Sequence, residues 1–193
     1  MPSPLTRHFY SQDTLTVARR LLGKKLIRYR RGKRLSGIVL ETEAYLGESD
    51  SASHAFKGRT PRNRVMFGPA GKAYVYFIYG MHYLLNVVTE KEGIPSAVLI
   101  RALKPLEGIK QMEIWRSCKG FNLTNGPAKL CQALNIDTQF NECDLTEGKT
   151  LWLENCITIA DHRICAGPRI GIDYAAPRDR DAPRRFWISP KLL

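Results

Sequence analysis

Short runs of apolar residues, separated by turn residues, recur along most of the chain and predict strands. Apolar, β-branched and aromatic residues with alternating polar positions are typical of strands bounded by Gly, Pro and Asn. Such runs occupy residues 24–30, 35–45, 71–80, 82–90, 95–103, 150–160, 163–173 and 184–189. The first two flank the turn RGK at 31–33, so we expect them to pair as a hairpin.

Helical signals mark three other segments, residues 12–23, 105–116 and 125–135. In the first, Asp13 suits the N-cap and Gly23 follows the end. Its predicted apolar face consists of Leu15, Ala18 and Leu22. In the third, a proline at position 127 suits the first helical turn. Strands and helices together predict a single domain over residues 1–193, an α/β protein of the α+β type. Helices would surround a curved, mostly antiparallel β-sheet or open barrel.

Composition is that of a folded protein without a membrane span. Of the 193 residues, 44% are apolar and 25% are charged, which is ordinary for one domain with a sizeable core. No stretch approaches the roughly 20 consecutive apolar residues of a membrane-spanning helix. The start, MPSPLTRHFY, lacks the apolar region of a secretory signal. We therefore expect a protein that is neither in a membrane nor secreted and that stays inside the cell.

The net charge points to a polyanionic partner. The chain has 30 Lys and Arg against 18 Asp and Glu, a formal charge of +12, and such an excess attracts phosphates. Many of the cations fall in three loop-like segments, 28–34, 57–64 and 177–185. Loops can bring basic groups to phosphates without disturbing a core. Solvated turns are the alternative interpretation of each segment.

Cysteine and histidine spacing indicates neither a disulfide framework nor a metal site. The five cysteines form an odd set without a C-x-x-C pair, and the four histidines are scattered. Disulfide scaffolds and zinc sites need paired or closely spaced ligands. We expect reduced, mostly buried thiols and no bound metal.

The segment ETEAY at 41–45 places two carboxylates where a strand continues from SGIVL. Alternation along a strand predicts one face with Val39, Glu41, Glu43 and Tyr45. The other face would carry Ile38, Leu40 and Thr42. A buried carboxylate without partners is costly or takes up a proton, so burial demands salt bridges or a function. A solvated edge beside Lys or Arg is the open alternative.

A tyrosine ladder lies in the strand that follows the basic segment TPRNR. Tyr74, Tyr76 and Tyr79 alternate with apolar residues there. Core or cross-strand packing explains most such ladders. Beside arginines in a basic protein, the same rings can stack on bases or wedge between them. The glycine after Tyr79 predicts a bend from which that ring projects.

Five motifs together resemble one enzyme family. They are ETEAYLGESDSASHA, TPRNRVMF, AYVYFIYGMHYLLNVV, LIRALKPLEG and GPAKLCQAL. In this order they are similar to the alkyladenine (3-methyladenine, or methylpurine) DNA glycosylases, from about residue 7 to residue 188. The resemblance implies a monofunctional hydrolase of base-excision repair. Such an enzyme flips alkylated or deaminated purines out of duplex DNA, cleaves the N-glycosidic bond and leaves an abasic site.

The resemblance also implies the surroundings in which the enzyme works. The expected partner is double-stranded DNA that contains damaged purines, bound from the minor groove by a monomer without a cofactor or a metal. The expected location is the cytoplasm, on the nucleoid, in a bacterial host and the nucleus in a eukaryotic one.

For catalysis, the resemblance assigns the general base to Glu43, the second glutamate of ETEAY. Hydrolysis of an N-glycosidic bond passes through an oxocarbenium-like sugar. An anionic carboxylate stabilises the positive charge of this sugar and also activates the water that attacks it. Arg101 matches the arginine that helps to hold this water, and the carbonyl of Ile170 completes the site. Glu41 is then a structural residue.

For recognition, the resemblance assigns aromatic and polar groups to the base pocket. Tyr45 and Tyr76 match the rings that sandwich the flipped purine, and cationic alkylated bases are attracted to such π-faces. His54 and Asn86 match further pocket residues, and Tyr79 matches the wedge that fills the vacated stack. Contacts with the DNA backbone are expected from Arg59, Arg62, Arg64, Lys129 and Arg169.

Two other classes of function remain open on the residues alone. A metal-dependent nuclease could use Glu41, Glu43, Asp50 and His54 as ligands. A binder without enzymatic activity could use the basic loops and tyrosines. The nuclease should lose activity in chelator and cut the backbone, the glycosylase should release free base in chelator, and the binder should release nothing.

Overall fold

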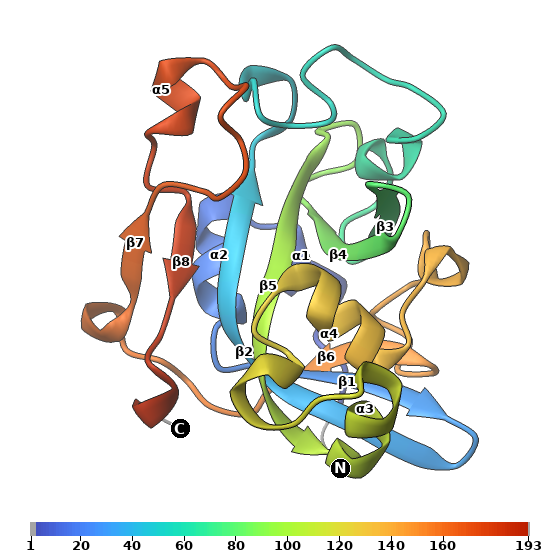
Figure 1. The fold of residues 1–193 in the computed structure, drawn as a ribbon. Helices are drawn as coiled ribbons and strands as arrows, with labels where there is room; N and C mark the ends of the chain where they lie inside the picture. Colours follow the sequence, from blue (N-terminus) through green and yellow to red (C-terminus); the bar gives the residue numbers. More distant parts are fainter. Residues whose placement is uncertain (1–2, 193) are drawn as a thin grey trace.

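The computed structural model describes residues 3–192 and is built on one open antiparallel sheet (Figure 1). Its strands are β1 (Lys25–Arg30), β2 (Lys33–Tyr45), β3 (Ala73–Ile78), β4 (His82–Thr89), β5 (Ser96–Glu107), β6 (Leu151–Glu154), β7 (Cys165–Gly167) and β8 (Arg185–Trp187). Their order is β3-β4-β5-β2-β1-β6, and β8 pairs with both β2 and β7. The predicted α+β class with a mostly antiparallel, open sheet is confirmed.

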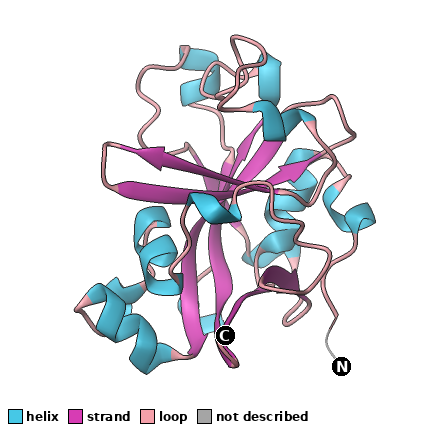
Figure 2. Cartoon of the chain, turned by 90° about the vertical axis from the view of Figure 1, so that its right-hand side faces the viewer, coloured by secondary structure: helices cyan, strands magenta, loops and turns pink. Residues whose placement is uncertain are grey.

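Short helices and loops lie around this sheet (Figure 2). The helices are α1 (Arg7–Tyr10), α2 (Thr14–Leu21), α3 (Ile109–Arg116), α4 (Pro127–Leu134) and α5 (Pro177–Arg180). The predicted N-cap is confirmed, because a side-chain oxygen of Asp13 accepts a 2.8 Å hydrogen bond from the Thr16 N–H. None of the helices among residues 3–192 has the length and apolarity needed to cross a membrane.

Some predicted boundaries are wrong. The first predicted helix ends at Leu21 and buries Val17, Ala18 and Leu21, so Leu22 follows the helix as its cap. The helix predicted from residue 105 begins at 109, because β5 continues to Glu107 and Gly108 turns the chain in the left-handed region, with φ 74°. A Cβ on Gly108 would meet the Leu35 side chain at 2.9 Å. The three final strands are three or four residues long, since the rest of their predicted runs forms loops.

Two bulges interrupt the pairing of β2 with β5 at the start of the acidic segment. Val39 faces Leu103 and Glu41 faces Ala102, which leaves Leu40 as an extra residue on β2. The next pair joins residues 42 and 100, so Arg101 is an extra residue on β5. An inserted residue moves the side chains on its two sides to different faces of a sheet. The prediction that Val39 shares a face with the two glutamates is therefore wrong, and Val39 packs in the main apolar core.

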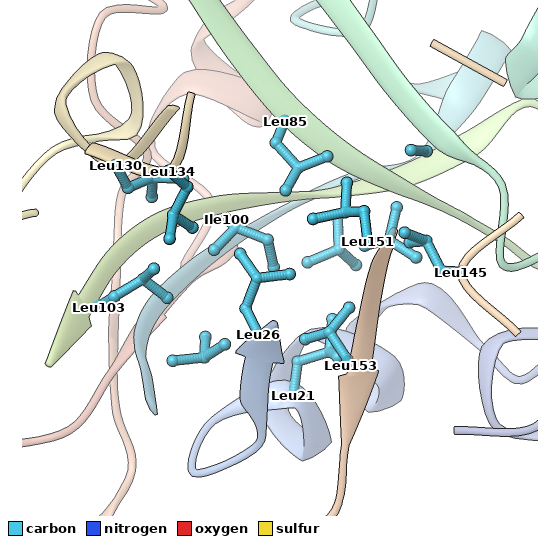
Figure 3. Close-up of a cluster of buried hydrophobic side chains, with 14 of the residues drawn as sticks. Leu21, Leu26, Leu85, Ile100, Leu103, Leu130, Leu134, Leu145, Leu151 and Leu153 are labelled. Carbon is cyan, nitrogen blue, oxygen red and sulfur yellow. The ribbon is translucent and has the colours of Figure 1, made fainter. Parts of the chain in front are cut away.

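That core holds β2 and β5 in place. Leucines and isoleucines from the sheet, from α2 and α4 and from the loop before β6 point toward one another (Figure 3). The labelled members are Leu21, Leu26, Leu85, Ile100, Leu103, Leu130, Leu134, Leu145, Leu151 and Leu153. Full burial of one such side chain stabilises a fold by about 1.5–3 kcal/mol. The acidic segment of β2 thus sits on a rigid support.

Candidate active site

Two glutamates and one arginine form a continuous chain of ion pairs across β2 and β5. Arg101 Nε lies 2.9 Å from Glu41 Oε1, and Arg101 Nη1 lies 3.3 Å from Glu43 Oε1. From β8, Arg185 Nη1 adds a contact of 3.2 Å to Glu41 Oε1. The bulge at Arg101 directs the guanidinium between the carboxylates, as bulges beside functional sites often do.

Glu43 is a fully buried carboxylate with few partners. Besides Arg101, its Oε1 accepts a 2.8 Å hydrogen bond from the Ile170 N–H, and its Oε2 accepts a 2.9 Å bond from the Tyr45 hydroxyl. Burial raises the pKa of Glu43, and Arg101 and the two hydrogen bonds oppose that rise without cancelling it. A buried carboxyl with a raised pKa accepts a proton more readily than an ordinary glutamate does.

A cavity of about 300 Å³ opens beside this carboxylate. Tyr45, Arg101 and Ile170, the three partners of Glu43, all line it. Its other walls carry Ser53, His54, Met66, Tyr74, Tyr76, Asn86, Pro127, Ala128 and Tyr174, among others. Sites of this size with aromatic walls and a few polar groups bind small planar ligands.

His54 is a neutral polar group in the aromatic wall. Burial, and secondarily the nearby Arg62, lower the pKa of His54 to about 4. Its Nδ1 lies 2.8 Å from the Tyr74 hydroxyl, and its ring meets the Tyr76 ring edge-on at 4.5 Å between centroids. The loop that carries His54 is fixed by Asn63, whose amide donates a 2.8 Å hydrogen bond to the His54 carbonyl.

The β3–β4 turn presents Tyr79 at the cavity mouth in an unusual conformation. Tyr79 has φ 53° and Gly80 has φ 67°, and the Met81 N–H closes the turn on the Ile78 carbonyl at 3.2 Å. Two positive φ values define a turn that normally takes Asn and Gly, so tyrosine is strained there. The residue is 79% exposed although it lines the cavity. The predicted bend after Tyr79 is confirmed, and such strain is typical of functional positions.

Comparison with known proteins identifies the family. Residues 8–191 match the model of the family described as "Methylpurine-DNA glycosylase (MPG)". The chain belongs to the methylpurine-DNA glycosylase family. It is therefore a DNA glycosylase that acts on alkylated purines.

Curated relatives are similar over nearly their whole length. Two of them carry the name "Putative 3-methyladenine DNA glycosylase". One, from Methanocella arvoryzae, is 49% identical over 185 residues, which cover 95% of this chain and 91% of the relative. The other, from Clostridium acetobutylicum, is 47% identical over 194 residues, which cover 95% and 93%.

The structure brings together most of the residues that the resemblance to methylpurine-DNA glycosylases implied. Tyr45, His54, Tyr76, Asn86 and Tyr79 all line the cavity, as do Arg101 and Ile170. The resemblance implied a role for the carbonyl of Ile170, whereas the structure also uses its N–H as a donor to the carboxylate. The backbone of Ile170 thus holds the Glu43 carboxylate in place, and the same residue lines the cavity.

Four of the five expected backbone contacts lie at least partly on the surface. The Arg62 guanidinium stacks 5.2 Å from the Tyr76 ring centroid, and Arg59 lies 5.7 Å from that of Phe67. Arg64 is 64% exposed in its side chain and pairs with Glu142 at 3.0 Å. Lys129, in α4, donates a 2.8 Å hydrogen bond to Asn125. Contacts with phosphate remain a prediction for these four cations.

Arg169 differs from its prediction. Its side chain is fully buried and donates to both oxygens of Asp50, to the Ala44 carbonyl at 2.9 Å and to the Asp179 carbonyl at 3.0 Å. It also stacks on Tyr45, 4.7 Å from the ring centroid. No phosphate can reach a guanidinium enclosed in this way, so the predicted backbone contact of Arg169 is wrong.

The ligand set of the alternative metal-dependent nuclease is not assembled. Within residues 3–192, no group of three or more His, Cys, Asp and Glu side chains is placed to hold a metal ion. Asp50 instead pairs with Arg169 and Arg184, and His54 contacts tyrosines. The geometry therefore does not favour the nuclease.

Several site residues were missed from the sequence. Tyr74 is one of the alternating tyrosines that the strand pattern explains by packing, yet its hydroxyl also contacts His54. Asn63, which anchors the loop of His54, carries no signal except its place after a proline and arginine. Pro127 was noted only as a helix start, although it and Ala128 line the cavity. Tyr174 lies in a loop that was predicted to follow a strand, and nothing in its local pattern distinguishes it.

Proposed function

We propose that the protein flips a damaged purine out of duplex DNA into the cavity and hydrolyses its N-glycosidic bond. The water would be activated by Glu43, and the products would be a free base and an abasic site. The proposal rests above all on one observation, a fully buried carboxylate whose partners line an aromatic cavity of about 300 Å³. A cavity of this kind suits one nucleobase better than an intact nucleic-acid strand.

The proposed chemistry uses the free acceptor capacity of Glu43. Its Oε2 receives the Tyr45 hydroxyl as its one hydrogen bond from the described residues, and a carboxylate oxygen can accept a second. A water bound there would give its proton to Glu43 while its oxygen forms a bond to C1′. The bond from C1′ to the base nitrogen breaks, and its electron pair leaves with the base. The negative charge of Glu43 would stabilise the sugar cation between these events.

Recognition is proposed to depend on electron-poor bases. The Tyr45 and Tyr76 rings offer π-faces to a cationic alkylated purine. His54, with its pKa near 4, is neutral at pH 7 and does not repel a cationic base. An alkylated purine that already carries positive charge also leaves as a neutral base, so the reaction needs no strong acid.

Base flipping would depend on a wedge and on contacts with phosphates. Extruding a base costs a few kcal/mol of unstacking, which wedging and phosphate contacts must offset. Tyr79, strained and exposed at the mouth, suits the wedge. Arg62, which stacks on the cavity residue Tyr76, and the exposed Arg59, which stacks on Phe67, suit phosphate contacts.

A panel of lesion duplexes tests the proposal. Duplexes that carry 3-methyladenine, 7-methylguanine, hypoxanthine or ethenoadenine are incubated with the protein in EDTA, and the released base is identified. We expect free alkylated base and an abasic site, with the DNA strand intact until alkali is added. An undamaged duplex of the same sequence is the control.

Two outcomes would contradict the proposal. Strand cleavage that EDTA abolishes would favour a metal-dependent nuclease. Tight binding of every duplex without release of any base would favour a binder without enzymatic activity.

A further inference from the structure

Tyr174 is a large exposed ring at the mouth of the cavity to which the proposed chemistry assigns no role. It lies in the loop between β7 and α5, and its residue is 70% exposed. It lines the same cavity as Tyr79, which comes from the β3–β4 turn. Two exposed tyrosines from different elements therefore meet at one opening.

The exposed ring is held in place. The Tyr174 hydroxyl donates a 3.1 Å hydrogen bond to the Ala52 carbonyl. Two residues later, the Ala176 N–H donates a 2.9 Å bond to Ser51 Oγ. Burial raises the pKa of the Tyr174 hydroxyl, so the group keeps its proton and remains a donor. A ring fixed at its distal end loses little freedom when it binds a ligand, which favours binding.

The supporting loop is also fixed from below. Ile172 and Ala175, on the two sides of Tyr174, are buried against Ala52 and pack with Tyr45. The Ala175 N–H closes a turn on the Ile172 carbonyl at 2.9 Å. The chain thus buries the neighbours of Tyr174 and presents the ring itself. Packing of the loop does not require an exposed aromatic side chain, because the small cluster beneath is complete without it.

The position suits a base that has lost its neighbour. When one nucleotide leaves the stack, the adjacent base exposes a π-face at the opening. Aromatic side chains bind such faces in a sequence-tolerant way. Arg178, 77% exposed in its side chain, lies four residues further on, and its guanidinium bonds the Ser49 carbonyl at 3.4 Å. Aromatic rings and cations that serve the same strand are the usual combination in proteins that bind single-stranded nucleic acid.

We propose that Tyr174 is a DNA-contacting residue whose ring stacks on the base next to the flipped nucleotide. Tyr79 enters the vacated position and stacks on the base at one side of it, and Tyr174 covers the base at the other side, so the two rings together hold the opened duplex. This inference rests on the proposed base flipping. It adds a contact that stabilises the flipped complex and leaves the bond-breaking step to Glu43.

The test separates binding from chemistry. Tyr174→Ala, Tyr174→Phe and the wild type are compared for their dissociation constant on a lesion duplex and for single-turnover excision at saturating protein. Phe121→Ala is the matched control, since Phe121 is 77% exposed and lines a different hollow of the surface. Melting temperatures verify that each variant is folded.

We expect Tyr174→Ala to weaken binding of the lesion duplex roughly 5- to 150-fold, the usual effect of losing one base–aromatic stack. Its single-turnover excision rate at saturation should fall by no more than the same factor, because only the flipped state is destabilised and Glu43 is unchanged. Tyr174→Phe keeps the ring and should bind within about threefold of wild type. Affinity for an undamaged duplex should be unchanged, because no base is extruded there.

The inference is overturned if Tyr174→Ala binds the lesion duplex as tightly as Phe121→Ala does. It is also overturned if Tyr174→Phe loses as much affinity as Tyr174→Ala, or if the undamaged duplex is affected equally. A wild-type protein that releases no base would instead overturn the proposed function. The two failures are thus distinguishable.

Discussion

Two buried acid–arginine clusters lie side by side in this protein, and they are satisfied to different degrees. Asp50 is fully buried and receives both nitrogens of Arg169, Arg184 at 3.4 Å, and the backbone N–H groups of Leu46 and Ala52. Glu43, equally buried, shares Arg101 with Glu41 and receives two further hydrogen bonds. In the first cluster, two arginines surround the single carboxylate of Asp50. In the second, two carboxylates share the single guanidinium of Arg101.

This difference is the one that the proposed function requires between a structural carboxylate and a general base. The carboxylate oxygens of Asp50 accept hydrogen bonds from groups within the fold, and these bonds join the loop at 46–52 to the loop around Arg169. Glu43 keeps an acceptor site, and its pKa stays raised because burial outweighs its partners. The partners of Glu43 line the cavity. Burial alone would not have distinguished the two acids.

The largest effect on excision is expected from Glu43→Gln. Excision should fall by about 10²–10⁴-fold, because a neutral amide neither takes a proton from water nor stabilises the sugar cation. Folding stability should change little, since Gln can still accept from the Ile170 N–H and donate to Tyr45. Single-turnover excision and binding of the lesion duplex are measured together. Near-normal excision by a folded variant would contradict the role of Glu43.

Asp50→Asn should have the opposite profile. Removing the charge leaves Arg169 buried beside a neutral amide, and breaking a buried ion pair costs about 3–5 kcal/mol of unfolding free energy. Denaturant unfolding measures this loss. The fraction of Asp50→Asn that remains folded should excise the base at a rate closer to that of wild type than the rate of Glu43→Gln. A stable but inactive Asp50→Asn protein would show that the two clusters act as one.

The pH dependence should also differ between the clusters. In the proposed mechanism excision needs deprotonated Glu43, so the single-turnover rate should fall about tenfold per pH unit below the raised pKa of this group. That pKa lies above the ordinary glutamate value of about 4.3. The pKa of Glu43 is higher in the folded than in the unfolded protein. The contribution of its protonated form to folding stability is therefore fully present below the pKa of the unfolded state and is lost as the pH rises through the pKa of the folded state.

Asp179, in the Asp50 cluster, has the opposite sign. Burial raises the pKa of Asp179, but the hydrogen bonds from Ser51 and the charges of Arg184 and Arg178 together outweigh burial and lower this pKa to about 2. Its contribution to stability is therefore present above its unfolded pKa of about 3.9 and is lost as pH falls toward 2. Circular dichroism at each pH verifies that loss of excision precedes unfolding. An excision rate that stays constant to below pH 4 would contradict the raised pKa of Glu43.

The smallest effect should come from Glu41→Gln. The substitution removes one partner of Arg101 and of Arg185, while the pair of Arg101 with Glu43 remains. We expect less than about a tenfold loss of excision, since a positioning contact is removed and the general base is kept. The same single-turnover assay measures it. If folded Glu41→Gln were the inactive variant and Glu43→Gln the active one, the general base would lie two residues upstream.

Local sequence patterns predicted much of the fold. Alternating apolar residues gave the positions of β1 to β5, and Asp13 and Pro127 correctly marked helix starts. These features depend on contacts within a few residues, which local patterns contain. The short final strands were overpredicted, because apolar residues at 155–173 line loops as well as strands.

By itself, the sequence determined which residues are chemically able to form the site. The motif around ETEAY named Glu43 and Tyr45, and LIRAL named Arg101, before any contact was known. Only the tertiary structure decided how they meet. The bulges at Leu40 and Arg101 set the faces of the strands, and Arg169 was drawn inward by Asp50, 119 residues away in the chain. The Ile170 N–H reached Glu43 across 127 residues. Such contacts depend on how distant segments pack and on which buried charge finds a partner, and no local pattern of residues contains that information.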